Sequence, residues 1–405
     1  MTTDKKDRIP NAPDKGLLPK LRLPEFVDEW SSHPTTDFFE FKNGLNPEAK
    51  RFGTGTKFIS VMDILNNHYI TYEKIISSVI PKESDLKDFG VNYGDILFQR
   101  SSETLEDVGR ANVYLDNKTA LFGGFVIRGK KIGEYDPLFF RYMLSSPCAR
   151  KRIIVKGAGA QHFNIGQNGL SKVELFVPSL YEQKRIGNLF NLLDERIETQ
   201  SRAIEDLKRL KSAIVEVLYK QDKPTHKIGD VIVQVSTRNR LNDNYSVLSV
   251  NNRLGFIEQS EQFEDRMVAS DDTSNYKIVK YNDFAYNPAR INVGSIARLT
   301  SFDSGIVSPM YICFHTKRSL LPEYLEYFFD THYFFNEMQK RLEGSVRLCL
   351  SWEGLCNIPI AVPSIEEQQK VGNRISDLAQ KISLEENYLE LLKKQKQFLL
   401  QSMFI

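Results

Sequence analysis

The chain contains 405 residues, of which 41% are hydrophobic and 26% are charged, and its formal net charge is +2. This composition is typical of a folded globular protein and excludes a disordered, a collagen-like and a disulfide-scaffold chain. No apolar run approaches the ~20 residues needed to span a bilayer, and the charged N-terminus has no signal-peptide core. The four cysteines are scattered. We therefore expect a cytoplasmic protein with no membrane partner.

The N-terminal half is expected to consist of a tail at 1–24 and a first globular domain at 25–178. Residues 58–61 have the character of a strand, residues 91–98 that of a turn followed by a strand, and residues 137–144 that of an aromatic-rich helix. A domain of about 150 residues can bury its own core. The pattern predicts a mixed α/β domain.

The end of this domain is basic, because no Asp or Glu occurs between Pro137 and Val173. Such a run is usually a solvated face, but its lack of acids and the amide residues beside it favour nucleic-acid binding. Lys and Arg contact phosphates, while Arg, Asn and Gln can read base edges. The candidate DNA-binding residues in this domain are Lys57, Arg100, Arg110, Arg150, Lys151, Arg152, Lys156, Gln161, His162 and Asn164.

Residues 179–222 are expected to form a long helix. Pro178 precedes it, Glu182 lies in its first turn, and apolar residues then recur at heptad spacing. Two polar residues, Gln200 and Lys211, interrupt the series. The predicted seam consists of Ile186, Phe190, Leu193, Ile197, Ile204, Leu207, Ile214 and Leu218.

The chain then repeats itself with a shift of 185 residues. VPSLYEQKRIGN at 177–188 returns as VPSIEEQQKVGN at 362–373, whereas the two halves agree only in patches before Pro137. The repeat predicts a second domain at 223–363 and a second helix at 364–405. The seam of that helix would be Val371, Ile375, Leu378, Ile382, Leu389, Leu392, Leu399 and Met403, with Glu385 and Lys396 as its polar interruptions.

The matched interruptions favour a coiled-coil pair, because an ordinary amphipathic helix would drift to a period of 3.6 and would need no matching polar positions. The first helix ends shortly before the second domain, and that domain leads directly into the second helix. An antiparallel pair satisfies both connections. The expected fold class is α/β, with two repeated mixed α/β domains separated by a long antiparallel two-helix coiled coil.

Motifs for catalysis and for cofactor or metal binding are missing from the sequence. Gly157-Ala158-Gly159 does not continue into a dinucleotide loop, and there is no Walker-type loop, CxxC pair, histidine ligand spacing or nucleophile elbow. We therefore expect no catalytic residue, no cofactor and no metal.

One loop of the second domain resembles the Asn-Pro-Pro-aromatic loop of adenine-N6 methyltransferases. The sequence Asn287-Pro288-Ala289-Arg290 lacks the second proline and the aromatic residue, which argues against catalysis. Asn287 and Arg290 are either DNA contacts or turn formers. The other DNA-binding candidates of this domain are Arg238, Arg240, Arg298, Arg341 and Arg347.

A duplicated domain followed by a VPSxxEQxxIG-type motif and a long helix resembles the DNA-specificity (S) subunit of type I restriction-modification systems, the HsdS family. The sequence PKLRLPEF at 19–26, followed by Trp30, is also similar to the start of many such subunits. The resemblance covers nearly the whole chain. The repeated motif is highly specific, whereas that family varies its domains freely.

This resemblance implies a non-catalytic, sequence-specific DNA-binding subunit. Each domain would read one half of a bipartite, asymmetric site on double-stranded DNA, and the coiled coil would dock two methyltransferase subunits. S-adenosylmethionine would be held by these methyltransferase partners, and ATP and Mg by two restriction subunits where a system contains them. The residues that the resemblance assigns to the start of each helix and to subunit docking are Glu182, Gln183, Gly187, Glu367, Gln368 and Gly372.

Two other functions are compatible with parts of the sequence. An autonomous DNA methyltransferase or nuclease is disfavoured because the catalytic and cofactor motifs are missing. A structural coiled-coil adaptor that binds only protein is disfavoured because the acid-free basic segment would then serve no purpose.

Overall fold

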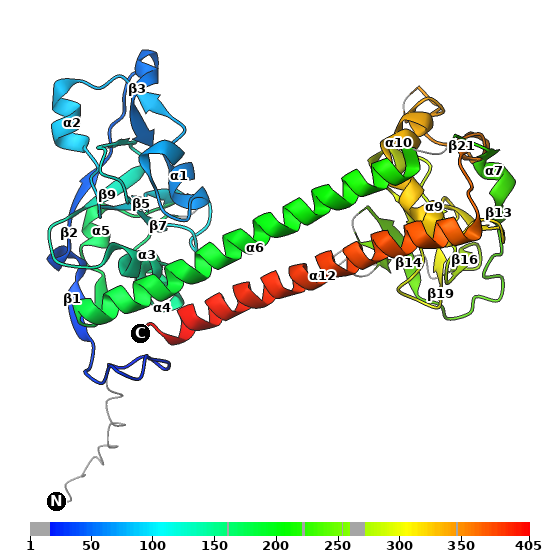
Figure 1. Cartoon of the computed structure of the whole chain (residues 1–405). Coiled ribbons are helices and arrows are strands. Elements are labelled where there is room, and N and C mark those ends of the chain that lie inside the picture. The colour runs from blue at the N-terminus through cyan, green and yellow to red at the C-terminus, as the bar shows by residue number, and fades with distance from the viewer. Residues whose placement is uncertain (1–16, 160–161, 221–222, 253, 260–271, 346) are drawn as a thin grey trace, which may run out of the picture. The chain divides into compact units, whose positions relative to one another are not determined.

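A computed structural model describes residues 17–159, 162–220, 223–252, 254–259, 272–345 and 347–405 (Figure 1). The DNA-binding candidate Gln161 lies outside the described residues. The chain divides into unit 1, formed by Met1–Ser201 and Asn387–Ile405, and unit 2, formed by Arg202–Glu386. Each unit contains one mixed α/β domain and a segment of both long helices, α6 (Leu180–Lys220) and α12 (Ile365–Ser402).

Unit 1 contains an antiparallel sheet of four strands in the order β2-β9-β5-β7. A smaller sheet has the order β4-β3-β8, in which β3 and β8 are parallel. The strands are β2 (Phe39–Asn43), β9 (Val126–Lys131), β5 (Ile96–Gln99), β7 (Ala111–Val113), β4 (Ser78–Val79), β3 (Phe52–Ile59) and β8 (Leu121–Phe122). The remaining pairs are β1 (Ser31–Pro34) with β11 (Glu174–Val177), and β6 (Ser101–Ser102) with β10 (Phe163–Asn164).

The short helices of unit 1 lie between these strands along the chain. They are α1 (Val61–Asn66), α2 (Glu83–Phe89), α3 (Pro137–Ser145), α4 (Pro147–Ile154) and α5 (Gln167–Leu170). The main core joins the aromatic residues of α3 to Trp30, to Phe190 of α6 and to Phe404 near the chain end. The core of this domain therefore extends onto both long helices.

Unit 2 has the same architecture. Its four-stranded antiparallel sheet has the order β13-β20-β17-β18, and its second sheet the order β15-β14-β19-β16. The strands are β13 (Ile232–Val235), β20 (Ile312–Thr316), β17 (Phe284–Tyr286), β18 (Ile296–Arg298), β15 (Gly255–Glu258), β14 (Val247–Asn251), β19 (Ser304–Val307) and β16 (Lys277–Lys280). The other elements are α7 (Ile228–Val231), α9 (Pro322–Phe329), α10 (His332–Gln339), α11 (Trp352–Cys356) and the pair β12 (His226–Lys227) with β21 (Pro359–Ile360).

The register of the strands reveals the repeat where the sequence is patchy. Phe39 pairs with Lys131 in unit 1, and Ile232 pairs with Thr316 in unit 2. Ile96 faces Val113 in one sheet, and Phe284 faces Arg298 in the other. Equivalent positions therefore lie 185 residues apart for β7 and β9, 188 for β5 and 193 for β2. Insertions between the strands have changed the spacing between equivalent residues of the two halves. A single ungapped shift therefore fails before Pro137.

One local prediction was wrong. Residues 58–61 were expected to be a strand, but β3 ends at Ile59 and Ser60 caps helix α1. Ser60 and Asp63 form a capping box, with the Ser60 amide donating to the Asp63 carboxylate at 2.7 Å. The equivalent segment of unit 2 continues as a strand to Asn251.

The two long helices run antiparallel within each unit. In unit 1 the beginning of α6 lies beside the end of α12, where Phe190 and Phe404 are in ring contact at 5.6 Å. In unit 2 the end of α6 lies beside the beginning of α12, where Val215 and Ile375 share an apolar cluster. All predicted seam residues are buried or half-buried. The predicted mixed α/β class with two long helices packed together is confirmed.

Residues 17–24, which the sequence places in a tail, are packed into unit 1. The Leu21 amide donates to the carbonyl of Ser402 at 2.9 Å, and the Trp30 amide donates to the carbonyl of Leu17 at the same distance. The segment is held because Arg22 and Trp30 both reach Glu182 at the start of α6. It therefore joins the two ends of the chain inside one unit.

Candidate nucleic-acid and partner interface

A buried glutamine fixes each domain to the start of its long helix. Gln183 accepts a hydrogen bond from the Asp136 amide at 3.0 Å and donates to the carbonyl of Pro178. Gln368 accepts from the Leu321 amide at 2.7 Å and donates to the carbonyls of Ser319 and Pro363. Both side chains satisfy backbone groups at the N-terminal end of an aromatic helix, α3 or α9. These glutamines therefore build the domain–helix junction and are not exposed for docking.

The other residues predicted at the helix starts differ between the repeats. Glu182 is 1% exposed and accepts two hydrogen bonds from the Arg22 guanidinium, at 2.8 and 2.7 Å. Glu367 is exposed and, among the described residues, accepts hydrogen bonds only from Ser364, which directly precedes α12. Gly187 lies against Asp136 and Phe139 of its domain, whereas an added Cβ at Gly372 would meet no atom closer than 3.7 Å.

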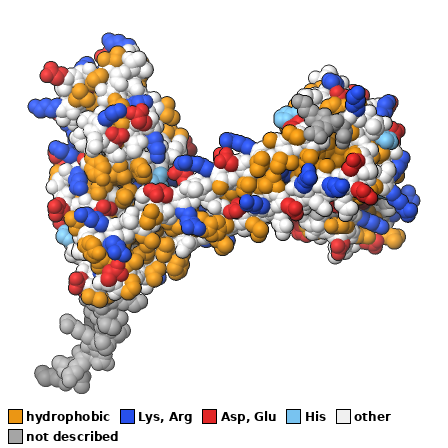
Figure 2. Space-filling model, in the orientation of Figure 1, with side chains coloured by type: hydrophobic (Ala, Val, Ile, Leu, Met, Phe, Trp, Pro, Cys, Tyr) orange, Lys and Arg blue, Asp and Glu red, His pale blue; other side chains and the backbone are white. Residues whose placement is uncertain are grey.

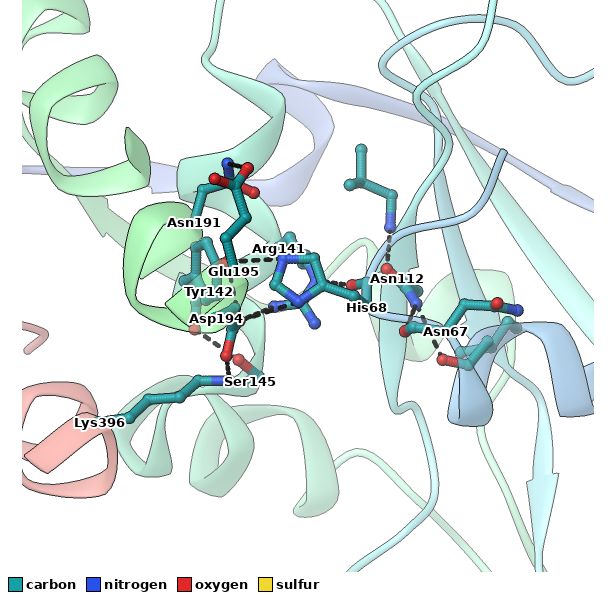
Figure 3. Close-up of polar contacts among 12 residues, drawn as sticks. Asn67, His68, Asn112, Arg141, Tyr142, Ser145, Asn191, Asp194, Glu195 and Lys396 are labelled. Atoms are coloured by element: carbon teal, nitrogen blue, oxygen red, sulfur yellow. Dashed lines mark hydrogen bonds and ion pairs between the residues drawn. The ribbon is translucent and has the colours of Figure 1, made fainter. Parts of the chain in front are cut away.

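The polar interruption Lys396 is explained by a buried cluster in unit 1 (Figure 3). Its ammonium pairs with the Asp194 carboxylate of α6 at 2.5 Å, and the hydroxyl of Tyr142 donates to the same carboxylate at 2.9 Å. His68 and Arg141 also face Asp194, at 3.1 and 3.8 Å. Burial, followed by repulsion from the Arg141 charge, lowers the pKa of His68 to about 4, so this imidazole is neutral at pH 7.

Unit 2 contains the equivalent lysine, and the carboxylate that it pairs with has fewer contacts among the described residues than Asp194 has. Lys211 pairs with Asp330 at 3.7 Å and lies over the ring of Tyr327, as Lys396 lies over the ring of Tyr142. In both repeats the lysine leaves the seam to pair with a carboxylate beside the aromatic helix of its domain. The two lysines that interrupt the heptad pattern, Lys396 and Lys211, therefore help to attach the domains to the helix pair.

The arginines of the acid-free basic segment are engaged inside unit 1. Arg141 is part of the buried cluster, and Arg150 donates to the carbonyls of Glu106 and Val108 at 2.9 and 2.6 Å. Burial and the nearby Arg110 charge lower the pKa of Arg150 to about 10. Arg152 donates to the Ile405 carbonyl at 2.7 Å and stacks over Phe176. These arginines hold the end of α12 and the surrounding loops.

The lysines of the same segment point outward. Lys151, Lys156 and Lys172 are exposed, and their ammonium groups make no hydrogen bond or ion pair with any described residue. Lys151 lies at a cleft of about 500 Å³ that is also lined by Arg110 and Arg150. Exposed unpaired cations at such a rim are the groups that contact DNA phosphates.

The other candidates of unit 1 are partly committed to intramolecular contacts. Lys57 donates to the Ile75 carbonyl, Arg100 donates to the Gly124 carbonyl, and Arg110 pairs with Asp107. Asn164 is exposed and accepts from Ser101, while His162 is exposed beside it. Arg100, Arg110, His162 and Asn164 are exposed, whereas Lys57 is half-buried.

The candidates of unit 2 divide in the same way. Arg298 is buried between Glu323 and Glu326 of α9, and Arg341 pairs with Glu337. Arg238 donates to Asn275. Arg240, Arg290 and Arg347 are exposed and make no polar side-chain contact within the described part of the chain. The half-buried Asn287 belongs to a turn, because its backbone carbonyl accepts from the Arg290 amide at 3.0 Å.

Sequence reasoning missed a second apolar series on α12. Leu384, Leu391 and Phe398 are 63%, 62% and 59% exposed, and they follow one another at heptad spacing. Hydrophobic side chains are visible along the long helices, whereas charges of both signs are mixed over the rest of the visible face (Figure 2). The seven-residue recurrence is present in the sequence, but it is hidden beside the stronger seam pattern.

The described residues form neither a metal-binding cluster nor a membrane-spanning helix. Residues 17–159, 162–220, 223–252, 254–259, 272–345 and 347–405 contain no group of three or more His, Cys, Asp or Glu able to hold a metal ion. Within the same residues, every helix is too short or too polar to cross a membrane. All four cysteines are free thiols.

Comparison with known proteins decides the family. Residues 27–209 match the family model described as type I restriction modification DNA specificity domain. The chain is 22% identical to a putative type I restriction enzyme MjaX specificity subunit of Methanocaldococcus jannaschii, over 93% of both chains. Residues 27–209 therefore belong to the type I restriction modification DNA specificity domain family, and the chain is similar to a specificity (S) subunit over 93% of its length.

Two further comparisons agree with this assignment. The EcoKI specificity subunit of Escherichia coli K12 is 26% identical over 44% of this chain and 39% of its own length. The crystal structure of an S subunit from M. genitalium has the same fold, with a TM-score of 0.57 and 17% identity, and covers 96% of this chain and 99% of that chain. The protein is a DNA specificity subunit, which is the non-catalytic component of a type I restriction-modification enzyme.

Proposed function

We propose that each mixed α/β domain reads one half of a bipartite, asymmetric site on double-stranded DNA. The observation that carries this proposal is the duplication, since β2-β9-β5-β7 and β13-β20-β17-β18 share strand order and register while their sequences differ. The scaffold fixes where a domain holds its side chains, and the side chains at base edges set the sequence that is read. Two diverged copies of one scaffold therefore suit two different half-sites.

The exposed cations of each domain supply the phosphate contacts in this proposal. They are Lys151, Lys156 and Lys172 in unit 1, and Arg240 and Arg347 in unit 2. Phosphate contacts orient a protein on the duplex and make its affinity depend on salt. The arginines committed to intramolecular pairs, including Arg152 and Arg298, serve the fold.

The long helices bind two methyltransferase subunits in this proposal. Leu384, Leu391 and Phe398 support it, because three exposed apolar side chains at heptad spacing form a stripe that a partner helix can cover. One solved structure with the same fold, at a TM-score of 0.57, concerns complex assembly of the type I restriction-modification system. S-adenosylmethionine then belongs to the methyltransferase partners and ATP with Mg to restriction partners, all in the cytoplasm.

Single-molecule methylome sequencing tests this function. The host is sequenced with the gene intact and with the gene deleted. Loss of one bipartite adenine-methylated motif, with its halves separated by a fixed number of unspecified bases, is the expected result. An unchanged methylome in a host that contains an active cognate methyltransferase would contradict the proposal.

A further inference from the structure

The two domains have a pocket at the same place in the repeated fold. In unit 1, β3 and β8 run parallel with Phe58 opposite Leu121, and in unit 2, β14 and β19 run parallel with Val247 opposite Ile306. In each unit a pocket opens beyond the last paired residues of these two strands, which are Ile59 with Phe122 in unit 1 and Leu248 with Val307 in unit 2. The pockets have similar volumes, about 390 Å³ in unit 1 and about 380 Å³ in unit 2.

The same positions of the repeat line both pockets. Gly123 and Phe125 follow β8 in unit 1, and Ser308 and Met310, each 185 positions later, follow β19 in unit 2. On the opposite wall, the lining residues are 60–62 in unit 1, which directly follow β3, and 249–251 in unit 2, which are the last residues of β14. The pockets are therefore repeat mates.

The chemistry of the two linings has diverged. In unit 1 the exposed lining side chains are apolar except for Asn46, with Phe125 at 70%, Met62 at 58% and Phe52 at 46% exposure. The lining of unit 2 includes polar side chains, which are Ser249, Asn251, Asn252, Gln259, Asn287, Arg290 and Ser308. The fold was kept at this position while the side chains that meet a ligand were exchanged.

Two residues of the polar pocket have hydrogen-bonding capacity to spare. The guanidinium of Arg290 is exposed and makes no polar contact with any residue that the structure describes. The amide nitrogen of Asn287 faces only the weak acceptor Met310 Sδ, at 3.7 Å. An arginine can bind O6 and N7 of guanine, and an asparagine can bind N6 and N7 of adenine. These residues stand on the turn between β17 and β18.

We infer that this pair of pockets is where the two domains read their half-sites, with Arg290 and Asn287 as specificity-determining residues of unit 2. The inference rests on the proposed function and names its reading surface. In unit 2 the pocket hydrogen-bonds base edges. In unit 1 the apolar pocket offers Phe125 and Met62 to the methyl group of thymine, so its half-site is read by apolar contact.

Binding-site selection from a library of random DNA duplexes tests this inference. The full chain is used in complex with the methyltransferase subunit of its own system. We compare the wild type with Arg290→Ala, Arg290→Lys, Asn287→Ala and Phe125→Ala. Arg318→Ala is the matched control, because Arg318 is another exposed arginine of unit 2 that does not line the pocket.

The expected result is loss of base preference in one half of the motif, by about 10-fold or more at one or more base pairs, for Arg290→Ala and Asn287→Ala. Arg290→Lys keeps the charge but not the two-pronged donor, so it should bind DNA and still lose that preference. Phe125→Ala should alter only the other half, and Arg318→Ala neither half. Thermal unfolding curves of the free chains verify that each variant is folded.

Two results would overturn the inference. One is that the Arg290→Ala and Asn287→Ala variants are both folded and each still selects both half-motifs. The other is an equal loss of affinity on every sequence, which would make Arg290 a phosphate contact only. A wild-type complex that selects no motif would instead refute the proposed function itself, and the inference would fall with it.

Discussion

The ammonium of Lys396 on α12 pairs with the carboxylate of Asp194 on α6, at a position where the heptad pattern of α12 is interrupted. Asp194 is 7% exposed and is also contacted by Tyr142, His68 and Arg141. The contact ties two distant parts of the chain to the domain of unit 1. The equivalent lysine of unit 2, Lys211, pairs with Asp330 at the end of α9, a carboxylate at a different position of the repeat, and this pair is longer and more exposed.

Replacing Asp194 should destabilise unit 1. Asp194→Asn removes the only carboxylate in the buried contacts described for Lys396 and Arg141, and breaking one partner of a buried pair costs roughly 3–5 kcal/mol. Asp330→Asn is the control, since its carboxylate is 56% exposed and an exposed pair contributes about 1 kcal/mol or less. Urea unfolding of the purified chain measures both values, and equal effects would contradict the difference between the repeats.

The neutral state of His68 predicts a pH dependence of stability. Its pKa is about 4 in the folded chain, below the value of about 6.5 in the unfolded chain, so the unfolded state binds the proton first. The contribution is present above pH 6.5 and is lost as the pH falls toward 4, by up to about 3 kcal/mol. His68→Gln should flatten the unfolding free energy over this interval. Identical pH profiles for both proteins would refute the assignment.

The two junction glycines should respond to alanine with opposite signs. At Gly187 an added Cβ would lie 2.6 Å from Asp136 Oδ1 and 2.8 Å from the Phe139 amide nitrogen, so Gly187→Ala should cost roughly 1–3 kcal/mol. At Gly372 the nearest atom would be 3.7 Å away, so Gly372→Ala should stabilise α12 by about 0.5–1 kcal/mol. Thermal unfolding of the two variants checks the signs, and destabilisation by both would show that Gly372 is also constrained.

Removing Arg22 should leave Glu182 as a buried, poorly compensated charge. The Arg22 and Glu182 side chains are 12% and 2% exposed, so Arg22→Ala should cost about 3 kcal/mol and release the N-terminal segment. Glu367→Ala, at the repeat mate, should cost about 1 kcal/mol or less because it removes only an exposed cap. Limited proteolysis near residue 22, together with urea unfolding, measures both effects.

The exposed lysines of the basic segment should control the salt dependence of DNA binding. Lys151→Ala with Lys156→Ala should lower the slope of log affinity against log salt by about 0.9 for each DNA phosphate that the variant no longer neutralises. Lys20→Ala serves as the control, because Lys20 is an exposed lysine of the same unit outside the acid-free basic segment. Titrations of the methyltransferase complex at several salt concentrations give the slopes, and an unchanged slope would place both lysines away from the DNA.

Part of the site could be predicted from the sequence and part could not. The exposed lysines, Asn287 and Arg290 came from charge and residue type. Residue type cannot show that Arg298 is buried between Glu323 and Glu326, or that Arg152 holds the Ile405 carbonyl. The sequence does not distinguish an unpaired arginine from a paired one, because the partner of a paired arginine lies far away along the chain.

The sequence by itself determined the duplication, the two long helices and the seam that joins them, because these are recorded in local spacing: a 185-residue shift and a heptad period. Only the tertiary structure decided which strands are equivalent. Insertions change the spacing between equivalent strands in the sequence, whereas the hydrogen-bond register identifies the residues that correspond. It also decided that Glu182 and Glu367 differ, because burial depends on what packs against a residue. The paired pockets likewise form only where the parallel pairing of strands distant in sequence stops.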